Sequence, residues 1–200
     1  MDEKGFMIGA LIRTKRIFTR KEFEKGLLLG AGQDGSRQWI TLVATICQDC
    51  TFLPPLLIYD GALGNVQDTW LEDFNPEEQE AFFSASPSGW TTDELGFQWL
   101  TTIFDRSTRK KARNGREYRL LIVDGHGSHI NMRFLDWCEQ NKVLVAVFPP
   151  HSTHRLQPLN VALFGPLATA YSQQINAWVH ARAGITGLLK RNFFKSFWVA

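Results

Sequence analysis

The 200-residue sequence lacks the features that mark secreted, membrane-spanning and disulfide-rich proteins. Its three cysteines are too few for a disulfide framework in a chain of this length. The longest apolar runs, such as residues 143–148, are far shorter than a membrane span, and the first residues, MDEKGF, do not resemble a signal peptide. We therefore expect a protein with no membrane partner that folds in a reducing compartment.

Charge of one sign is missing from two long segments. Residues 60–100 contain nine acids and no lysine or arginine, whereas residues 106–119 contain seven basic residues and one acid. No acid follows Glu139, so the last 61 residues carry only positive formal charges. The net charge of +2 alone indicates no class of partner, but the uneven distribution predicts one acidic and one basic surface.

The apolar pattern predicts a mixed sheet with antiparallel first strands. Pro54 and Pro55 interrupt the third expected strand, which favours an edge or a bulged position for it. The run at 118–123 is almost continuously apolar, which is typical of a strand covered on both faces. Strands are expected at residues 6–12, 39–47, 51–59, 118–123 and 143–148.

Helical spacing of apolar residues predicts helices at 92–103, 130–138 and 158–178. Thr92 and Asp93 can cap the first, and Pro158 suits the first position of the last. A strand, helix and strand over 118–148 form a parallel crossover unit. The sequence therefore predicts an α/β fold with helices on both faces of the sheet. A single domain is expected over 1–200, with an acidic, irregular insertion at about 60–92.

The segment LLIVDGHGSH, residues 121–130, places an acid at the end of a predicted parallel strand. The loop HSTHRLQPLN follows the end of the neighbouring strand, and functional groups gather beyond the carboxyl ends of such strands. Asp124 and this loop are therefore expected to meet. Gly125 and Gly127 would let a phosphate backbone approach the main chain. The alternative interpretation is a tight strand-to-helix turn with Ser128 as the helix cap.

Three segments, MDEKGF, LLIVDGHGSH and FPPHSTHRLQPLNVALFGPL, together resemble the DDE superfamily endonuclease domain of pogo and Tigger-like transposases, particularly the fungal ones. They occur in the same order and span essentially the whole chain. The resemblance implies an RNase H-like fold, a DNA partner, a nuclear location and a homodimer within a transposition complex. Relative to the family, the chain is expected to be N-terminally truncated and to lack a helix-turn-helix region.

The resemblance also implies three carboxylates that hold two Mg²⁺ or Mn²⁺ ions for DNA strand cleavage and transfer. The first two acids correspond to Asp2 and Asp124, whereas the third lies in a motif QPLDV that reads QPLNV here, with Asn160. Paired divalent ions require oxygen ligands with negative charge, and an amide keeps the oxygen but loses the charge. Because no acid follows Glu139, we expect greatly reduced or absent nuclease activity.

Histidines near these motifs allow a second interpretation, a zinc site that includes Asp124. Loop pairs of the form HxxH are weak evidence for zinc, and the lone pair Cys47 and Cys50 lacks a second pair to complete a shell. The histidines are interpreted instead as groups that orient phosphates or loop backbone by hydrogen bonding. With the neighbouring arginine they are assigned to nucleic-acid binding: His126, His129, His151, His154 and Arg155.

Basic residues form two further clusters that could contact DNA phosphates. Each could equally be a solvated loop or a nuclear-import signal. The first cluster contains Arg106, Arg109, Lys110, Lys111, Arg113 and Arg116, of which residues 109, 110, 111 and 113 are assigned to DNA. The second cluster lies after the first expected strand and comprises Arg13, Lys15, Arg16, Arg20 and Lys21.

Three functions follow from these observations. The first is a metal-dependent transposase catalytic domain. The second is a DNA-binding or chromatin-associated derivative that has lost the chemistry, and Asn160 favours it. The third is an unrelated α/β hydrolase or zinc protein, which the three ordered motifs disfavour. The target DNA and the oligomeric state leave no signature in the sequence.

Overall fold

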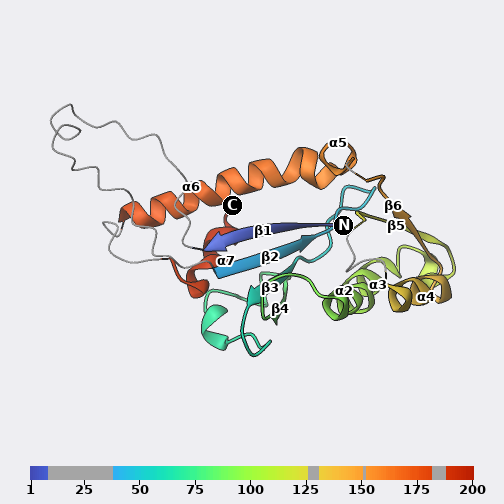
Figure 1. The fold of residues 1–200 in the computed structure, drawn as a ribbon, viewed down its shortest axis with the longest axis horizontal. Helices are drawn as coiled ribbons and strands as arrows, with labels where there is room; N and C mark the ends of the chain where they lie inside the picture. Colours follow the sequence, from blue (N-terminus) through green and yellow to red (C-terminus); the bar gives the residue numbers. More distant parts are fainter. Residues whose placement is uncertain (9–37, 126–130, 151, 182–187) are drawn as a thin grey trace.

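The structure of the protein is a computed structural model that describes residues 1–8, 38–125, 131–150, 152–181 and 188–200. A four-stranded sheet has the order β1-β2-β3-β4, and a two-stranded sheet pairs β5 with β6 (Figure 1). The first three strands are antiparallel, whereas β3 with β4 and β5 with β6 are parallel. The strands are β1 Asp2–Ile8, β2 Gln38–Ala44, β3 Leu56–Asp60, β4 Phe82–Ser86, β5 Arg119–Val123 and β6 Val143–Val147.

Helices connect and cover these strands. Thr92 caps the first α-helix, because its side-chain oxygen accepts a hydrogen bond from the Leu95 N–H at 3.3 Å. The α-helices are α2 Asp93–Trp99, α3 Asp105–Thr108, α4 Met132–Gln140, α5 Thr153–Leu156, α6 Phe164–Ala181 and α7 Lys190–Trp198. Shorter or wider turns are η1 Asp68–Trp70, η2 Leu100–Phe104, η3 Arg113–Gly115 and η5 Leu159–Leu163.

Alternating side chains of the central strands pack into two separate cores, one on each face of the sheet. In β3, Leu56 and Ile58 pack with α2, η2 and α4, whereas Leu57 and Tyr59 pack with η5, α6 and α7. This alternation is the period of two that a strand covered on both faces requires. Figure 1 shows α6 running along the four-stranded sheet, away from α2 and α4. The expected α/β class, with antiparallel first strands and a parallel crossover unit, is confirmed.

The long apolar stripe predicted from residue 158 onward is confirmed as part of the second core. Leu159, Tyr171 and Ile175 are buried there, and Leu163, Leu167 and Trp178 pack against them. Pro158 has helical backbone angles, φ −60° and ψ −34°, and directly precedes η5, as expected for a proline in the first turn. Figure 1 shows α6 running along the sheet, with its first residues, where η5 leads into it, on the side of the amino terminus.

Two predictions about strand position were wrong. Pro54 and Pro55 precede β3 and lie outside it, so β3 pairs with strands on both sides and occupies no edge. β5 is covered on one face only, because Leu120 is 61% exposed and Ile122 is 41% exposed. A continuous apolar run therefore did not indicate burial on both faces here.

Three predicted boundaries also differ from the structure. β1 begins at Asp2, earlier than the strand expected at 6–12, and residues 9–37 lie outside the described part. β4 lies within the segment of 60–92 expected to be irregular, and pairs with β3 over five residues. The segment after β6 was expected to be a loop but contains the short helix α5. Tertiary pairing with β3 explains β4, since its local sequence, FFSAS, gives only a weak strand signal.

A buried ion pair fixes β5 to the helical layer. The Arg119 guanidinium contacts the Asp105 carboxylate at 2.7 Å and donates to the Thr108 hydroxyl at 3.1 Å. It also donates to the Asn141 carbonyl oxygen at 3.1 Å. Only 7% of the Arg119 side chain is exposed, so the pair holds its geometry in a poorly solvated environment. The strand that leads to Asp124 is thereby held in place.

Candidate active site

Asp2 lies at the first position of β1, opposite Ala44 of β2. Only 5% of the residue is exposed, and its Oδ2 atom has no hydrogen-bond partner within the described part of the chain. A buried carboxylate oxygen without a donor is costly unless a cation or a proton compensates it. A positively charged ligand bound to Asp2 would therefore compensate its buried carboxylate.

The carboxyl group of Asp2 holds its proton unusually well. Burial is the main cause that raises its pKa to about 6, and the negative charge of Asp124 raises it further. A hydrogen bond from the backbone N–H of Glu3 acts in the opposite sense but is outweighed. The electrostatic effect of Asp124 on Asp2 requires the two carboxylates to lie near each other. The structure places Asp2 at the start of β1 and Asp124 directly after β5, and the charge of Asp124 acts on Asp2.

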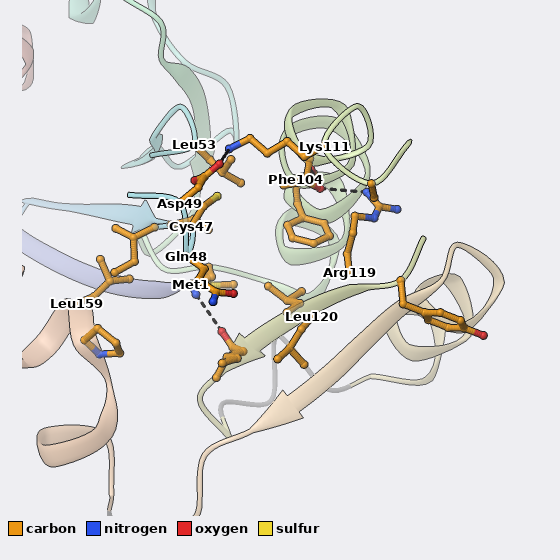
Figure 2. A pocket seen from close by; sticks show the side chains of 18 of the residues that line it. Met1, Cys47, Gln48, Asp49, Leu53, Phe104, Lys111, Arg119, Leu120 and Leu159 are labelled. Carbon is orange, nitrogen blue, oxygen red and sulfur yellow. Dashed lines mark hydrogen bonds and ion pairs between the residues drawn. The ribbon is translucent and has the colours of Figure 1, made fainter. Parts of the chain in front are cut away.

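Met1 joins three segments that are distant in sequence. Its nitrogen donates to the Ile122 carbonyl oxygen at 2.9 Å, a bond drawn in Figure 2. Its own carbonyl oxygen accepts a bond of 2.9 Å from Nε2 of Gln157, which is 2% exposed. The start of β1, the end of β5 and the segment before η5 therefore converge at one place. Asp2, Asp124 and Asn160 each follow one of these anchors within three residues.

Asn160 is the second residue of η5 and is exposed, whereas the preceding Leu159 is 1% exposed and packs into the second core. Its position follows from the hydrogen bond of Gln157 to Met1 and from the burial of Leu159. The amino end of a helix favours negative charge, and an asparagine there supplies none. Among the described residues, no group of three histidine, cysteine, aspartate or glutamate side chains is placed to hold a metal ion.

The described residues fit a divalent cation in part. Asp2 and Asp124 offer oxygen ligands of the kind that Mg²⁺ and Mn²⁺ prefer, and a cation would offset their mutual repulsion. The unpartnered Oδ2 of Asp2 is an available ligand atom. Asn160 could add only a neutral oxygen. The set therefore carries two negative charges from three candidate positions.

Comparison with known proteins assigns the fold to a family. The family model for the DDE superfamily endonuclease matches residues 36–194. The chain belongs to the DDE superfamily endonucleases. Its RNase H-like fold follows from that membership and agrees with the mixed sheet. Endonucleases of this family use divalent metal ions and act on DNA.

Two curated relatives resemble this DDE endonuclease domain. The MFS-type transporter clz9 of Cochliobolus lunatus is 36% identical over 178 residues, which cover 89% of this chain and 18% of that protein. The pogo transposable element with ZNF domain of Homo sapiens is 27% identical over 128 residues, which cover 62% of this chain and 8% of that protein. The chain thus spans less than a fifth of either relative. No solved structure matches it.

The matched range of the DDE endonuclease model includes Asp124 and Asn160 but begins after Asp2. The assignment of Asp2 therefore depends on the MDEKGF resemblance and on its position beside Asp124. Although one relative is named a transporter, no helix in the described ranges has the length and apolar character to span a bilayer.

The histidines assigned to DNA lie mainly outside the described residues. This holds for His126, His129 and His151, so the zinc alternative that uses them has no geometry to judge. His154 and Arg155 are exposed on α5, close in sequence to Gln157. The CxxC residues differ in environment, because Cys47 is half-buried and Cys50 is exposed with a positive φ of 62°.

The basic cluster at 106–116 is exposed, but acids neutralise part of it. Arg109 pairs with Asp105 at 3.2 Å, and Arg113 pairs with Glu117 at 2.9 Å. The Lys111 ammonium lies 2.7 Å from the Asp49 carboxylate. This hydrogen bond is the main cause that lowers the pKa of Asp49 to about 2, and hydrogen bonds from Thr51 lower it further. Lys110 is exposed, and so are Arg106 and Arg116. The second basic set, residues 13–21, lies outside the described ranges.

Two residues that position the site were not found from the sequence. Gln157 precedes Pro158 and is buried against Met1, and the only local signal is a polar residue between Leu156 and a proline. Arg119 was counted with the basic surface, yet it is buried with Asp105. Its place within an otherwise apolar strand could have indicated a buried ion pair.

Proposed function

We propose that this chain is the catalytic domain of a pogo-type transposase, which cleaves and transfers DNA strands by phosphoryl transfer and does so weakly. The observation that carries the proposal is the pair of Asp2 and Asp124, close enough for the charge of one to raise the pKa of the other. Such pairs are typical of sites that bind divalent cations. A single domain over residues 1–200, a nuclear location and a homodimeric transposition complex belong to the same proposal.

Two Mg²⁺ or Mn²⁺ ions bound at this site would stabilise the attacking and leaving oxygens of an in-line displacement at phosphorus. The strands and helices of the chain position the side chains that would bind these ions. β1 fixes Asp2 at its first position, and β5 delivers Asp124 directly after Val123. Gln157 acts as a positioning residue, because its bond to Met1 ties the segment before Asn160 to β1.

The exposed basic residues are proposed to hold the DNA backbone. Arg109, Lys110, Lys111 and Arg113 project from one connection between α3 and β5, while His154 and Arg155 lie on α5. His126, His129 and His151 belong to the same proposal as groups that orient phosphates. Contacts of this kind give affinity without sequence preference and depend on salt.

The proposed function is tested in a variant with the full set of acids. With Asn160→Asp in the chain, Mn²⁺-dependent nicking of supercoiled DNA is expected, and adding Asp2→Asn or Asp124→Asn should reduce it to the level without metal. Circular dichroism of each variant checks that the fold is kept. Equal nicking by the triple-acid variant and by both double variants would rule out this site as the nuclease centre.

A second function, DNA binding without cleavage, is favoured by Asn160, because two charges compensate paired cations poorly. Under this second function, the native chain binds DNA with an affinity that falls as the salt concentration rises, and it does not nick the DNA. The two functions share the DNA contacts and differ only in chemistry.

The salt dependence of DNA binding tests those contacts. Lys110→Gln should lower the slope of log K against log salt by about 0.9, the value for one lost phosphate contact. Lys195→Gln is the matched control, since Lys195 lies on α7 beside Asp73 and should leave the slope unchanged. Fluorescence anisotropy with duplexes of unrelated sequence measures both slopes. An equal change in the two variants would contradict a DNA-binding role for the 106–116 cluster.

A further inference from the structure

Two stacked tryptophans lie toward one end of the four-stranded sheet. The rings of Trp39, in β2, and Trp90, which follows β4, have centroids 4.8 Å apart and planes inclined by 30°. Trp90 is 50% exposed, although tryptophan usually buries most of its large apolar surface. In Figure 1, α2 and α4 lie toward the end of β1 marked N, whereas Trp39 pairs with Met7 near the other end of that strand. These two helices therefore leave the stack uncovered.

The register of the four strands places a carboxylate beside the stack. Met7 of β1 lies opposite Trp39, and the register of β2 with β3, continued by one position, places Asp60 on the other side of Trp39. Asp60 in turn lies opposite Ser86 of β4. A Cβ atom at Gly5 would lie 1.9 Å from the Trp39 ring, so this ring rests directly on the backbone of β1. The four strands thus present one row of side chains on the face that carries α2 and α4.

Hydrogen bonds hold both tryptophans in place. Nε1 of Trp39 donates to the Thr41 hydroxyl at 3.1 Å, and that hydroxyl donates to the Gly89 carbonyl oxygen at 2.6 Å. The Ser86 hydroxyl donates to the Trp90 carbonyl oxygen at 2.7 Å. Gly89 has a φ of 72°, a conformation that the tight turn before Trp90 requires and that glycine adopts without strain. The exposed ring is therefore fixed in orientation by its neighbours.

The surroundings of the stack are acidic. Residues 60–100 contain nine acids and no lysine or arginine. The Asp60 carboxylate is partly exposed and has no hydrogen bond or ion pair with any residue that the structure describes, and Asp93 is exposed at the start of α2. Lys190 donates to the main-chain carbonyl oxygen of Asp60, but it belongs to α7, which packs on the other face of the sheet. This surface therefore repels DNA phosphates and attracts cations.

A ring and a carboxylate already hold one arginine of this chain. The guanidinium carbon of Arg133 lies 3.9 Å from the centroid of the Phe97 ring, and its Nη1 atom lies 2.6 Å from the Glu94 carboxylate. Such a contact combines attraction to the face of the ring with a charge-assisted hydrogen bond. Tryptophan attracts a cation more strongly than phenylalanine does. Among the described residues, no cation lies over the Trp90 ring.

We infer that Trp90 and Asp60 form a binding site for an arginine side chain of a partner protein. The guanidinium stacks on the exposed face of the Trp90 ring, and its N–H groups donate to the Asp60 carboxylate. Arginine suits the site better than lysine, because its planar cation stacks and donates two parallel hydrogen bonds at once. The acids of residues 60–100 add a longer-range attraction for the basic segment that contains this arginine.

The test is a titration of the full chain, labelled with ¹⁵N, with a glycine-rich peptide that has one central arginine and capped ends. The indole N–H signal of Trp90 should shift and saturate with a Kd of about 1 mM or below. The indole signal of Trp99, which is 1% exposed in the core, should not move. The same peptide with citrulline, an uncharged isostere of arginine, should leave the Trp90 signal unchanged. Equal shifts with the two peptides would overturn the inference, and so would a Trp90 signal that neither peptide moves.

Three variants make the result specific. Trp90→Leu should weaken binding of the arginine peptide by at least about fivefold, measured at the Trp39 indole signal, because the ring that attracts the cation is lost. Asp60→Asn should weaken it to a similar degree, since the charge-assisted hydrogen bonds are lost. The matched control is Glu78→Gln, which removes an exposed acid before β4 and should leave the affinity almost unchanged. Circular dichroism checks that each variant keeps the fold.

Three results with these variants would contradict the inference. Undiminished binding by Trp90→Leu would show that the ring does not take part. Equal weakening by Asp60→Asn and Glu78→Gln would show a general attraction of the acidic segment without a defined site. Self-association of the native chain that Trp90→Leu abolishes would assign the arginine to a second copy of the chain, and the partner protein would be ruled out.

Discussion

Replacing Asp2 with asparagine is expected to change the pH dependence of stability by about 3 kcal/mol in the absence of divalent cations. The pKa of Asp2 is raised from 3.8 to about 6, chiefly by burial. A displacement of this size corresponds to about 3 kcal/mol, since one unit is about 1.36 kcal/mol. The residue is 5% exposed, so solvent screens the effect little.

The sign follows from the protons bound in each state. Because the folded pKa is above the unfolded pKa, the folded protein binds more protons than the unfolded protein between pH 3.8 and about 6. The contribution of Asp2 to stability is therefore highest below pH 3.8 and falls as the pH rises to about 6. It stays low above that value, where the buried carboxylate is charged. An asparagine does not titrate and lacks this loss.

Urea unfolding in EDTA from pH 4 to pH 7 measures the effect as the difference between variant and native free energies of unfolding. The difference should shift in favour of Asp2→Asn by about 2.4 kcal/mol over that range, because part of the full effect is already lost between pH 3 and pH 4. Asp49→Asn is the control and should show a much smaller shift, because the pKa of Asp49 is lowered to about 2 by its hydrogen bond to Lys111 and that carboxylate stays charged above pH 4. A difference that does not depend on pH would show that Asp2 is solvated or already paired with a cation.

Local patterns sufficed to predict the strands whose sequences are apolar and β-branched. β2, β5 and β6 and the stripe of η5 and α6 lie where the spacing of apolar residues put them. β4 was missed because its stability comes from pairing with β3, a contact that its five residues do not encode. The exposure of Leu120 and Ile122 depends on what packs over the sheet, and no strand sequence contains that information.

The candidate site was predictable to a similar degree. The position of Asp124 after a parallel strand predicted its place, because strand ends of this kind collect functional groups. The proximity of Asp2 depended on a resemblance, since a single acid near the start of a chain has no local signature. Gln157 became recognisable only through its bond to Met1 across 156 residues. Long-range backbone contacts of this type leave no periodic pattern in the sequence.

The charge at position 160 decides how well the site can hold two cations. Asp2 and Asp124 contribute two negative charges, and the chain has no acid after Glu139 that could add a third from the helical segment. The amino end of that segment would stabilise a carboxylate. The position is therefore suited to an acid by its surroundings and occupied by an amide.

Asn160→Asp should increase Mn²⁺-dependent DNA nicking by at least about 100-fold, which corresponds to roughly 3 kcal/mol of transition-state stabilisation. Asn160 is exposed, so the substitution should leave the fold intact. The variant should also show a larger rise in melting temperature with Mn²⁺ than the native chain, because ligands that bind the folded state stabilise it. This second readout does not depend on catalysis.

The matched control is Gln173→Glu, which adds the same charge at an exposed position further along α6. It should change neither nicking nor the response to Mn²⁺, because its distance from Asp2 and Asp124 places it outside the ligand set. Native and Asn160→Asp chains that nick at equal and robust rates would show that the amide does not impair the site. Equal Mn²⁺ stabilisation of the two chains would show that position 160 is not a ligand, since a full negative charge beside a divalent cation must raise its affinity.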